Sequence, residues 1–272
     1  MALPSPAPDT TVLVTGASAG IGEALARELA ERGHGLTLVA RSRDKLEALA
    51  ASLDVPVHVR PADLASDRSR RALLRALASG PTVVGVCNNA GTASFGPVVE
   101  HDPDAEEAML RTNVLALFDL TNRLVRPMVE RGSGAVLNLG SIVAFAPHPQ
   151  NATYAATKAF ISSWSEALHV ELAGSGVSCT SVNPGPTRTG IWDRSNAAGA
   201  SGAGLGLVWQ DPEDVARAAV DGMVRGRRTV TPGLTNKLAV LGYRFAPRTT
   251  LLPMLDVAQS DAVRRFVGRR DS

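Results

Sequence analysis

Short apolar runs rich in β-branched residues alternate with segments of helical periodicity along most of the chain. The stretch "TTVLVTG" is followed by "EALARELAERG" and then by "LTLVA", which predicts a strand, a helix that ends at glycine, and a second strand. The alternation continues through "VPVHVRP", "TVVGVCN", "GAVLNLG" and "VSCTSVNPG", with a helical segment before each. Near-continuous apolar strands between helices predict a parallel sheet covered by helices on both faces, the doubly wound, Rossmann-type α/β fold.

We expect a single domain over residues 11–232. The three prolines of "MALPSPAPDT" predict a disordered lead-in over 1–10. Residues 190–207 are rich in Gly, Ala and Ser, which favours a mobile substrate lid, although a plain linker would have the same composition. The extension over 233–272 mixes basic and apolar residues, and could cover the substrate cleft, join an oligomer interface or lie on a membrane.

Composition argues against several classes of protein. The 28 Lys and Arg residues nearly balance 26 Asp and Glu, and they are scattered, so nucleic acid is not an expected partner. Cys87 and Cys179 lie in apolar runs, which favours buried reduced thiols over disulfides or a metal site and suits the cytoplasm. The opening residues lack the pattern of a secretory signal, so no targeting segment is expected. Arg244 and Arg248 interrupt the most apolar late stretch, so no transmembrane segment is expected.

A glycine-rich turn, "TGASAGIG", follows the first strand and opens the first helix. Gly16, Gly20 and Gly22 fall where the backbone must approach a bound group closely, and where a helix N-terminus can receive a phosphate. This position favours a dinucleotide, although the glycines could simply form a tight turn.

The end of the second strand, "LVARSR", bears on the choice of cofactor. A free ribose 2′-hydroxyl is usually held there by a carboxylate, but this chain has Ala40 followed by Arg41, which favours the 2′-phosphate of NADP(H). Ser18 and Arg43 are possible auxiliary phosphate contacts; the alternative is that Arg41 is a solvated surface charge. Asp63, after the third strand, could accept a hydrogen bond from the adenine amino group or could cap the next helix.

Tyr154 and Lys158 stand four residues apart in "TYAATKAF", in a chain with only two tyrosines and three lysines. Positions four apart share a helix face, and a nearby ammonium favours the phenolate, so the tyrosine could exchange a proton. Ser141 follows the strand "AVLNLG" and could hydrogen-bond a carbonyl oxygen at the ligand edge of the sheet. An ordinary exposed helix pair and a serine that starts a loop are the alternatives.

From about Thr11 to Pro232 the chain resembles the short-chain dehydrogenase/reductase family, because "TGASAGIG", "NNAG", Asn113, Ser141, "YAATK" and "NPGPTRT" occur in order. The resemblance implies that Tyr154 is the general acid/base, that Lys158 lowers its pKa and holds the nicotinamide ribose, that Ser141 orients the carbonyl and that Asn113 supports a proton-relay water. It also implies that "NNAG" stabilises the sheet near the adenosine ribose and that Pro184 to Thr189 lie against the nicotinamide. The expected cofactor-binding residues are Gly16, Ser18, Gly20, Ile21, Gly22, Arg41, Asp63, Asn89, Ala90, Gly91, Tyr154, Lys158, Pro184, Gly185, Thr187 and Thr189.

These features predict an NADP(H)-dependent oxidoreductase that reduces a lipophilic ketone or aldehyde, with the reverse oxidation using the same groups. The mostly apolar segment "IVAFAPHPQNA" is the expected substrate wall, with Phe145, His148 and Gln150 as specificity candidates and His148 facing solvent outside catalysis. A homodimer or homotetramer is expected, sharing the helix "YAATKAFISSWSEALHVEL". The alternatives are a noncatalytic NADP(H) sensor, an epimerase or dehydratase that uses the same tyrosine, and a structural oligomer without a ligand.

Overall fold

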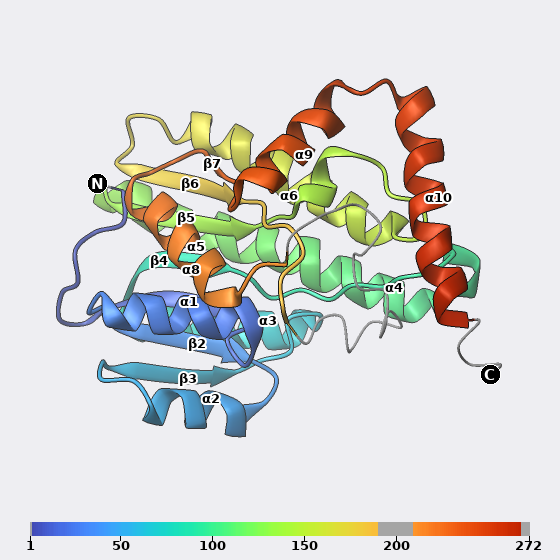
Figure 1. Ribbon diagram of the computed structural model, residues 1–272. Helices are drawn as coiled ribbons and strands as arrows, with labels where there is room; N and C mark the ends of the chain where they lie inside the picture. The colour runs from blue at the N-terminus through green and yellow to red at the C-terminus, as the bar shows by residue number, and fades with distance from the viewer. Residues whose placement is uncertain (1, 190–208, 268–272) are drawn as a thin grey trace.

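A sheet of seven parallel strands forms the centre of the protein, in the order β3-β2-β1-β4-β5-β6-β7 (Figure 1). The computed structural model describes residues 2–189 and 209–267. In this part of the chain the strands are β1 (Thr10–Thr15), β2 (Leu36–Ala40), β3 (Val57–Pro61), β4 (Thr82–Asn88), β5 (Gly134–Leu139), β6 (Val177–Val182) and β7 (Thr229–Val230). The predicted doubly wound α/β fold is therefore confirmed.

Helices cover both faces of this sheet. The helices before β6 are α1 (Gly20–Glu31), α2 (Arg43–Ala51), α3 (Asp67–Ala78), α4 (Pro103–Leu110), α5 (Leu117–Arg131) and α6 (Ala152–Glu171), and those after it are α8 (Pro212–Val224), α9 (Leu234–Phe245) and α10 (Arg248–Val267). Apolar side chains of α1, α2 and α8 form the core on one face, and those of α3, α5 and α6 contribute to the core on the other.

The central strand shows why the strands are almost wholly apolar. Val12 and Val14 of β1 belong to the α1/α8 core, whereas Leu13 belongs to the opposite core, and all three are fully buried. Alternate side chains of a strand point to opposite faces, so a strand packed by helices on both sides has no solvent face for polar residues.

The N-terminal segment differs from the disordered lead-in expected over 1–10. The Ala2 N–H donates to the Val224 carbonyl at 3.0 Å, Leu3 is buried in the α1/α8 core, and β1 already begins at Thr10. Three prolines do not prevent this, because an apolar side chain at position 3 reaches a gap over the sheet at Gly85, where an added Cβ would lie 2.8 Å from the Leu3 Cδ1.

Asn113 lies in a π-helical turn, Arg111–Ala116, between α4 and α5. Such turns widen the backbone spacing locally and are frequent at functional sites. The predicted lid over 190–207 lies outside the described residues.

The C-terminal extension forms α9 and α10, which pack against the short 3₁₀ turn η3 (Ile142–Phe145) and the residues after it. Tyr243, Leu251 and Leu255 are buried there against Ala146, with Phe145 at the margin. In the part of the chain that the structure describes, no helix combines the length and the apolar character that crossing a bilayer requires.

Candidate functional site

The carboxyl ends of β1, β4, β5 and β6 lie at one edge of the sheet, and the residues selected from the sequence gather there. In open parallel sheets this edge is where ligands bind, because the loops at the strand ends leave a crevice. The site has two parts, a glycine-rich cradle after β1 and a polar cluster after β5.

The cradle is shaped by glycines that no other residue could replace without strain or collision. Gly16 and Gly20 have φ angles of +67° and +58°. A Cβ on Gly22 would lie 2.2 Å from the Gly16 carbonyl oxygen and 2.3 Å from the Asn89 Nδ2, and one on Gly20 would lie 2.9 Å from the Thr189 Cγ2. The absence of side chains therefore lets Asn89 and Thr189 pack directly against the backbone of this turn.

The N-terminus of α1 opens onto the cradle. Its N-cap is Ala19, which provides no side-chain hydrogen bond to the first turn. Backbone N–H groups at such a terminus attract anions, so the position suits a dinucleotide phosphate. The Glu23 carboxylate in the first turn is paired with Arg27 at 2.8 Å.

The loop after β4 is fastened to the cradle. The Thr15 hydroxyl accepts hydrogen bonds from the N–H groups of Asn89 at 3.0 Å and Ala90 at 3.1 Å, and the Asn89 Nδ2 donates to the Thr15 carbonyl at 2.9 Å. Asn89 and Ala90 thus brace the glycine-rich turn through Thr15. Gly91 lies behind them, where an added Cβ would be 3.2 Å from the Asn113 Oδ1.

The first asparagine of the "NNAG" motif, Asn88, is not among the expected cofactor-binding residues. Its Nδ2 donates to Thr121 and to the Asn138 Oδ1, both at 2.8 Å, and the Asn138 Nδ2 donates to Ser165 at 2.9 Å. This buried chain ties β4 and β5 to α5 and α6. A polar residue inside an otherwise apolar strand is the signal that could have pointed to it.

Arg41 and Asp63, the two residues expected at the adenosine end of the cofactor, are exposed. Arg41 follows the buried Ala40, and among the described residues it forms no ion pair; Arg43 pairs with Glu47 at 3.2 Å. The Asp63 Oδ1 accepts the Ala65 N–H at 3.0 Å, while the N-cap of α3 is Ser66, so the helix-cap alternative for Asp63 does not hold. Ser18, the other auxiliary candidate, is half-buried in the glycine turn.

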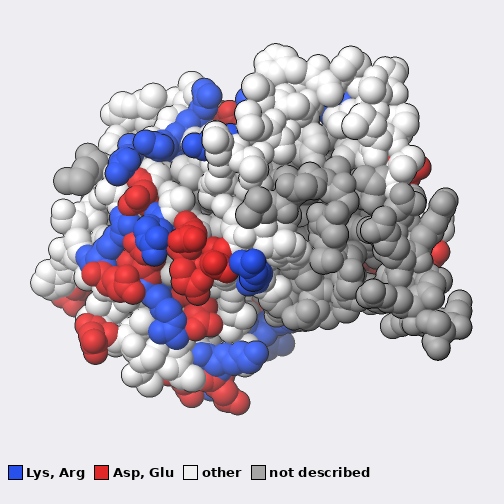
Figure 2. Space-filling view, viewed as in Figure 1, with Lys and Arg blue, Asp and Glu red and all other residues white. Residues whose placement is uncertain are grey.

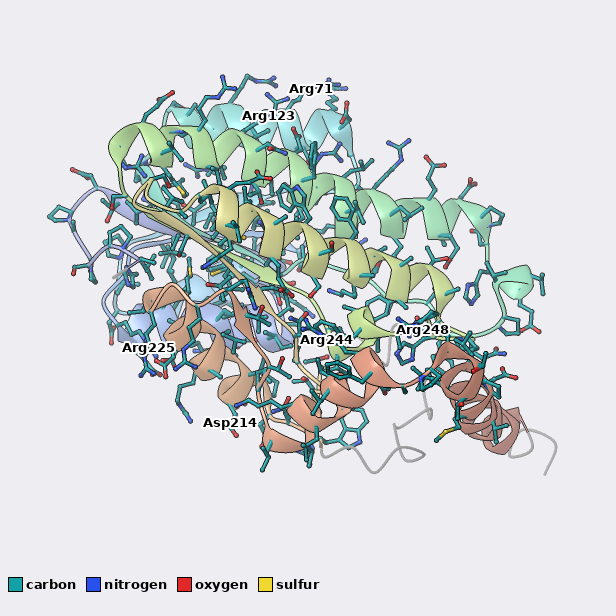
Figure 3. All side chains as sticks on the ribbon, turned by 90° about the horizontal axis from the view of Figure 1, so that it is seen from above. Arg71, Arg123, Asp214, Arg225, Arg244 and Arg248 are labelled. Carbon is teal, nitrogen blue, oxygen red and sulfur yellow. The ribbon has the colours of Figure 1, made fainter. Side chains whose placement is uncertain are left out.

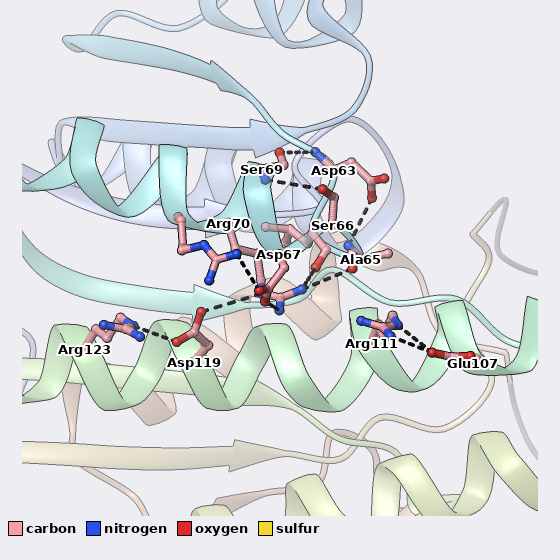
Figure 4. Close-up of polar contacts among 12 residues, drawn as sticks. Asp63, Ala65, Ser66, Asp67, Ser69, Arg70, Glu107, Arg111, Asp119 and Arg123 are labelled. Atoms are coloured by element: carbon pink, nitrogen blue, oxygen red, sulfur yellow. Dashed lines mark hydrogen bonds and ion pairs between the residues drawn. The ribbon is translucent and has the colours of Figure 1, made fainter.

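Arg70 holds the loop that carries Asp63, and sequence reasoning missed it (Figure 4). Its buried guanidinium donates to the Leu64 carbonyl at 2.7 Å and the Ala65 carbonyl at 3.2 Å, and pairs with Asp67. A buried arginine with several partners fixes a loop more firmly than backbone contacts alone.

Ser141, Tyr154 and Lys158 come together after β5. Ser141 caps η3, with its hydroxyl accepting the Val143 N–H at 3.3 Å, and it hydrogen-bonds the Tyr154 side chain. One turn along α6, the buried Lys158 Nζ lies 5.5 Å from the centre of the Tyr154 ring and donates to the Leu139 carbonyl at 2.7 Å. The helical spacing thus places the phenol and the ammonium at the same strand end.

Burial dominates the electrostatics of this cluster. It raises the pKa of Tyr154 to about 12, with the Ser141 hydrogen bond acting in the opposite direction, and lowers the pKa of Lys158 to about 8. The outcome differs from the expectation that the ammonium would lower the tyrosine pKa, because removing the phenolate from water costs more than a cation beyond hydrogen-bond reach returns. At neutral pH the pair is therefore a neutral phenol and an ammonium.

Asn113 lies in the π-helical turn and is fully engaged. Its Oδ1 accepts the Thr92 N–H at 2.9 Å, and its Nδ2 donates to the Thr92 carbonyl at 2.9 Å and the Thr157 hydroxyl at 3.1 Å. Thr157 in turn donates to the Tyr154 carbonyl at 2.7 Å. Asn113 thus joins the loop after β4 to the helix that carries Tyr154.

The segment after β6 is held by two buried asparagines that were not selected from the sequence. The Asn183 Oδ1 accepts the Ser141 N–H at 3.2 Å. Asn236 of α9 approaches Gly185 so closely that a Cβ there would lie 2.2 Å from its Oδ1. Pro184 and Gly185 are thereby fixed between Ser141 and α9, and the Thr187 hydroxyl donates to the Gly185 carbonyl at 3.0 Å.

The three substrate candidates are placed differently from one another. His148 is buried, in contrast to the expected solvent-facing position; its ring meets Tyr243 edge-on at 5.6 Å, and burial lowers its pKa to about 4. Phe145 stacks beneath the Arg244 guanidinium at 4.7 Å, and Gln150 has a φ of +62°. The sequence could not show the surroundings of His148 and Phe145, because their partners Tyr243 and Arg244 come from α9, about a hundred residues away.

Ile21, the second residue of α1, packs at the margin of the α1/α8 core. The described residues hold no group of three or more His, Cys, Asp or Glu side chains arranged around a metal site.

Comparison with known proteins agrees with this arrangement. The family model for short chain dehydrogenases matches residues 10–199. The NADP-dependent 3-hydroxy acid dehydrogenase of Salmonella typhi is 36% identical over 180 residues, which are 64% of this chain and 71% of that protein.

Two solved structures have similar folds. A short-chain dehydrogenase from Sphingobium yanoikuyae in complex with NADPH is 35% identical with a TM-score of 0.76, covering 85% of this chain and 92% of that one. The bulky-bulky ketone specific alcohol dehydrogenase from Comamonas testosteroni is 29% identical with a TM-score of 0.73, covering 88% and 95%. The chain therefore belongs to the short-chain dehydrogenase family.

Proposed function

We propose that this oxidoreductase transfers hydride between NADP(H) and a lipophilic ketone or aldehyde, with Ser141, Tyr154 and Lys158 as its catalytic residues. The observation that carries the proposal is the convergence of these three side chains at the strand end beside the glycine cradle. The cofactor, when bound, supplies the hydride.

The geometry fits proton donation in the direction of reduction. With a pKa of about 12, the Tyr154 phenol is protonated at neutral pH and can give its proton to a carbonyl oxygen as negative charge develops there. Ser141, already hydrogen-bonded to the phenol, can donate to the same oxygen and orient it. Lys158 uses one donor on the Leu139 carbonyl and retains others for ribose hydroxyls.

Arg41 supports NADP(H) as the cofactor. It stands exposed at the end of β2, where a carboxylate would repel a 2′-phosphate, and the guanidinium is suited to bind that group. The NADP-dependent relative and the neighbour solved with NADPH support the same choice.

The apolar residues of 142–146 support a lipophilic substrate. Ile142 and Ala146 are buried and Phe145 is half-buried, in the segment that begins one residue after Ser141. The neighbour described as specific for bulky-bulky ketones supports this substrate class.

The buried free thiols of Cys87 and Cys179 support a reducing, cytoplasmic location. Trp164 stacks on Phe160 and lies tilted against Phe118 of α5; both phenylalanines are exposed, and this aromatic surface supports a homo-oligomer that shares α6.

The test is NADPH consumption with a panel of lipophilic ketones and aldehydes, run beside NADH. Tyr154→Phe should lower kcat by at least 100-fold and leave NADPH binding within a few-fold, because it removes only the proton donor. Tyr243→Phe, which changes the other tyrosine of the chain, should retain activity. Tight NADPH binding without turnover of any carbonyl would contradict the reductase and favour the sensor.

A further inference from the structure

Helix α9 presents a second apolar face on the side opposite the one that packs on the protein. Asn236 and Tyr243 are buried against the body, whereas Leu234, Leu238, Leu241 and Phe245 are 72%, 60%, 55% and 77% exposed. At 3.6 residues per turn, spacings of four, three and four residues place these four side chains in one stripe, about 180° from the buried face. We call them the α9 stripe.

Cations border this stripe on one side. Lys237 and Arg244 lie about a quarter-turn from it and line a pocket between η3, β7 and α9, together with Arg228. Glu166 bridges Arg228 and Arg244, each at 3.4 Å, and among the described residues Lys237 has no ion pair. The pocket keeps a net positive charge beside the apolar surface.

The charge is one-sided over a much longer stretch. Residues 222–255 contain no Asp or Glu, although the whole chain is nearly neutral. The six cations of this stretch are Arg225, Arg227, Arg228, Lys237, Arg244 and Arg248. Figure 2 shows the outer surface over α9 and the start of α10 as largely uncharged, and Figure 3 shows Arg244 and Arg248 at the corner where the two helices meet. An apolar ridge whose border carries a net positive charge complements a surface that is apolar below and anionic above.

We propose that α9 docks the protein on the surface of an anionic lipid bilayer, with the α9 stripe among the acyl chains and Arg228, Lys237 and Arg244 at the phosphate level. A second copy of the chain fits less well, because a symmetric contact would bring these cations together. The four side chains of one three-turn helix are also small beside the roughly 800 Å² per partner of a stable interface. This inference is independent of the redox chemistry.

The test is co-sedimentation of the full chain with vesicles of phosphatidylcholine alone or of phosphatidylcholine and phosphatidylglycerol at about 7:3. Binding should be at least ten-fold tighter to the anionic vesicles and should weaken with added salt. The double variant Leu238→Ser/Phe245→Ser should lose at least ten-fold in partitioning, and Lys237→Gln about five-fold.

The matched control is Val98→Ser/Val99→Ser, since these residues are 60% and 88% exposed on a different segment and should leave binding unchanged. Circular dichroism should show all variants folded, because only exposed side chains change. The proposal is overturned if anionic vesicles are not bound or if the Leu238/Phe245 variant binds like the wild type. It is also overturned if light scattering shows that this variant converts a larger oligomer to a smaller one, which would identify a second copy as the occupant.

Discussion

Lys158 is the residue at which burial and charge conflict most directly. It is 5% exposed, and the pKa of its ammonium is lowered to about 8 because the charge is withdrawn from water. An apolar residue at this position would stabilise the folded state more than a buried amine does. The lysine therefore points to a functional role and not to a role in folding.

This pKa predicts the alkaline limit of activity. Below about pH 8 Lys158 is charged, and above it the charge is lost while Tyr154 stays protonated, so kcat/KM for reduction should fall as pH rises through about 8. Initial rates of carbonyl reduction measured from pH 6 to 10 give this pH dependence of kcat/KM. A wild-type profile that is flat to pH 10 would contradict the assignment of this limit to Lys158.

Arg41 should decide between the two nicotinamide cofactors. Arg41→Ala should raise KM for NADPH by roughly 10- to 100-fold and change KM for NADH little, because only the former has a 2′-phosphate to lose a charged contact. Lys45→Ala removes the same charge from an exposed position on α2 and serves as the control. Equal losses for both cofactors would show that Arg41 does not discriminate between them.

At the scale of elements, α9 and the segment after η3 meet through the His148–Tyr243 contact. Burial keeps His148 neutral, with a pKa of about 4 against about 6.5 in an unfolded chain. Between these values the unfolded chain binds more protons, so this histidine's contribution to stability is complete above about pH 6.5 and is lost as pH falls through about 4.

The free energy of unfolding should therefore decrease on acidification, by on the order of 2 kcal/mol from His148 at pH 4.5. Urea unfolding at pH 7.5 and pH 4.5 measures the difference, and His148→Gln should reduce it. His34, whose pKa is lowered by burial and by Arg32, acts in the same direction and would remain in the variant. An unchanged pH dependence in His148→Gln would refute this origin.

The sequence predicted the sheet, its helices and the clustering of several candidate site residues, because the causes of these features are local. Apolar runs form the strands, the glycines after β1 shape the cradle, and a four-residue spacing sets Tyr154 beside Lys158. The burial of His148 and the roles of Arg70 and Asn236 depend on partners from other segments, and no pattern within one segment encodes such contacts.

At the scale of the whole molecule, the N-terminal residues belong to the core. Leu3→Ala should lower the free energy of unfolding by about 2–4 kcal/mol, as for other buried leucines, because it opens a cavity beside Gly85. Chemical denaturation measures this, with the exposed Ser5→Ala as the control. A change below about 0.5 kcal/mol would mean that this segment contributes little to the fold.

The strand order also bears on how the protein is made. Every strand after β1 pairs with a strand that precedes it in the chain: β2 with β1, β3 with β2, β4 with β1, and β5, β6 and β7 each with the one before. As the chain leaves the ribosome N-terminus first, the partner of each new strand has already been synthesised. The sheet can therefore grow outward in both directions from β1 during translation, without waiting for the C-terminal helices.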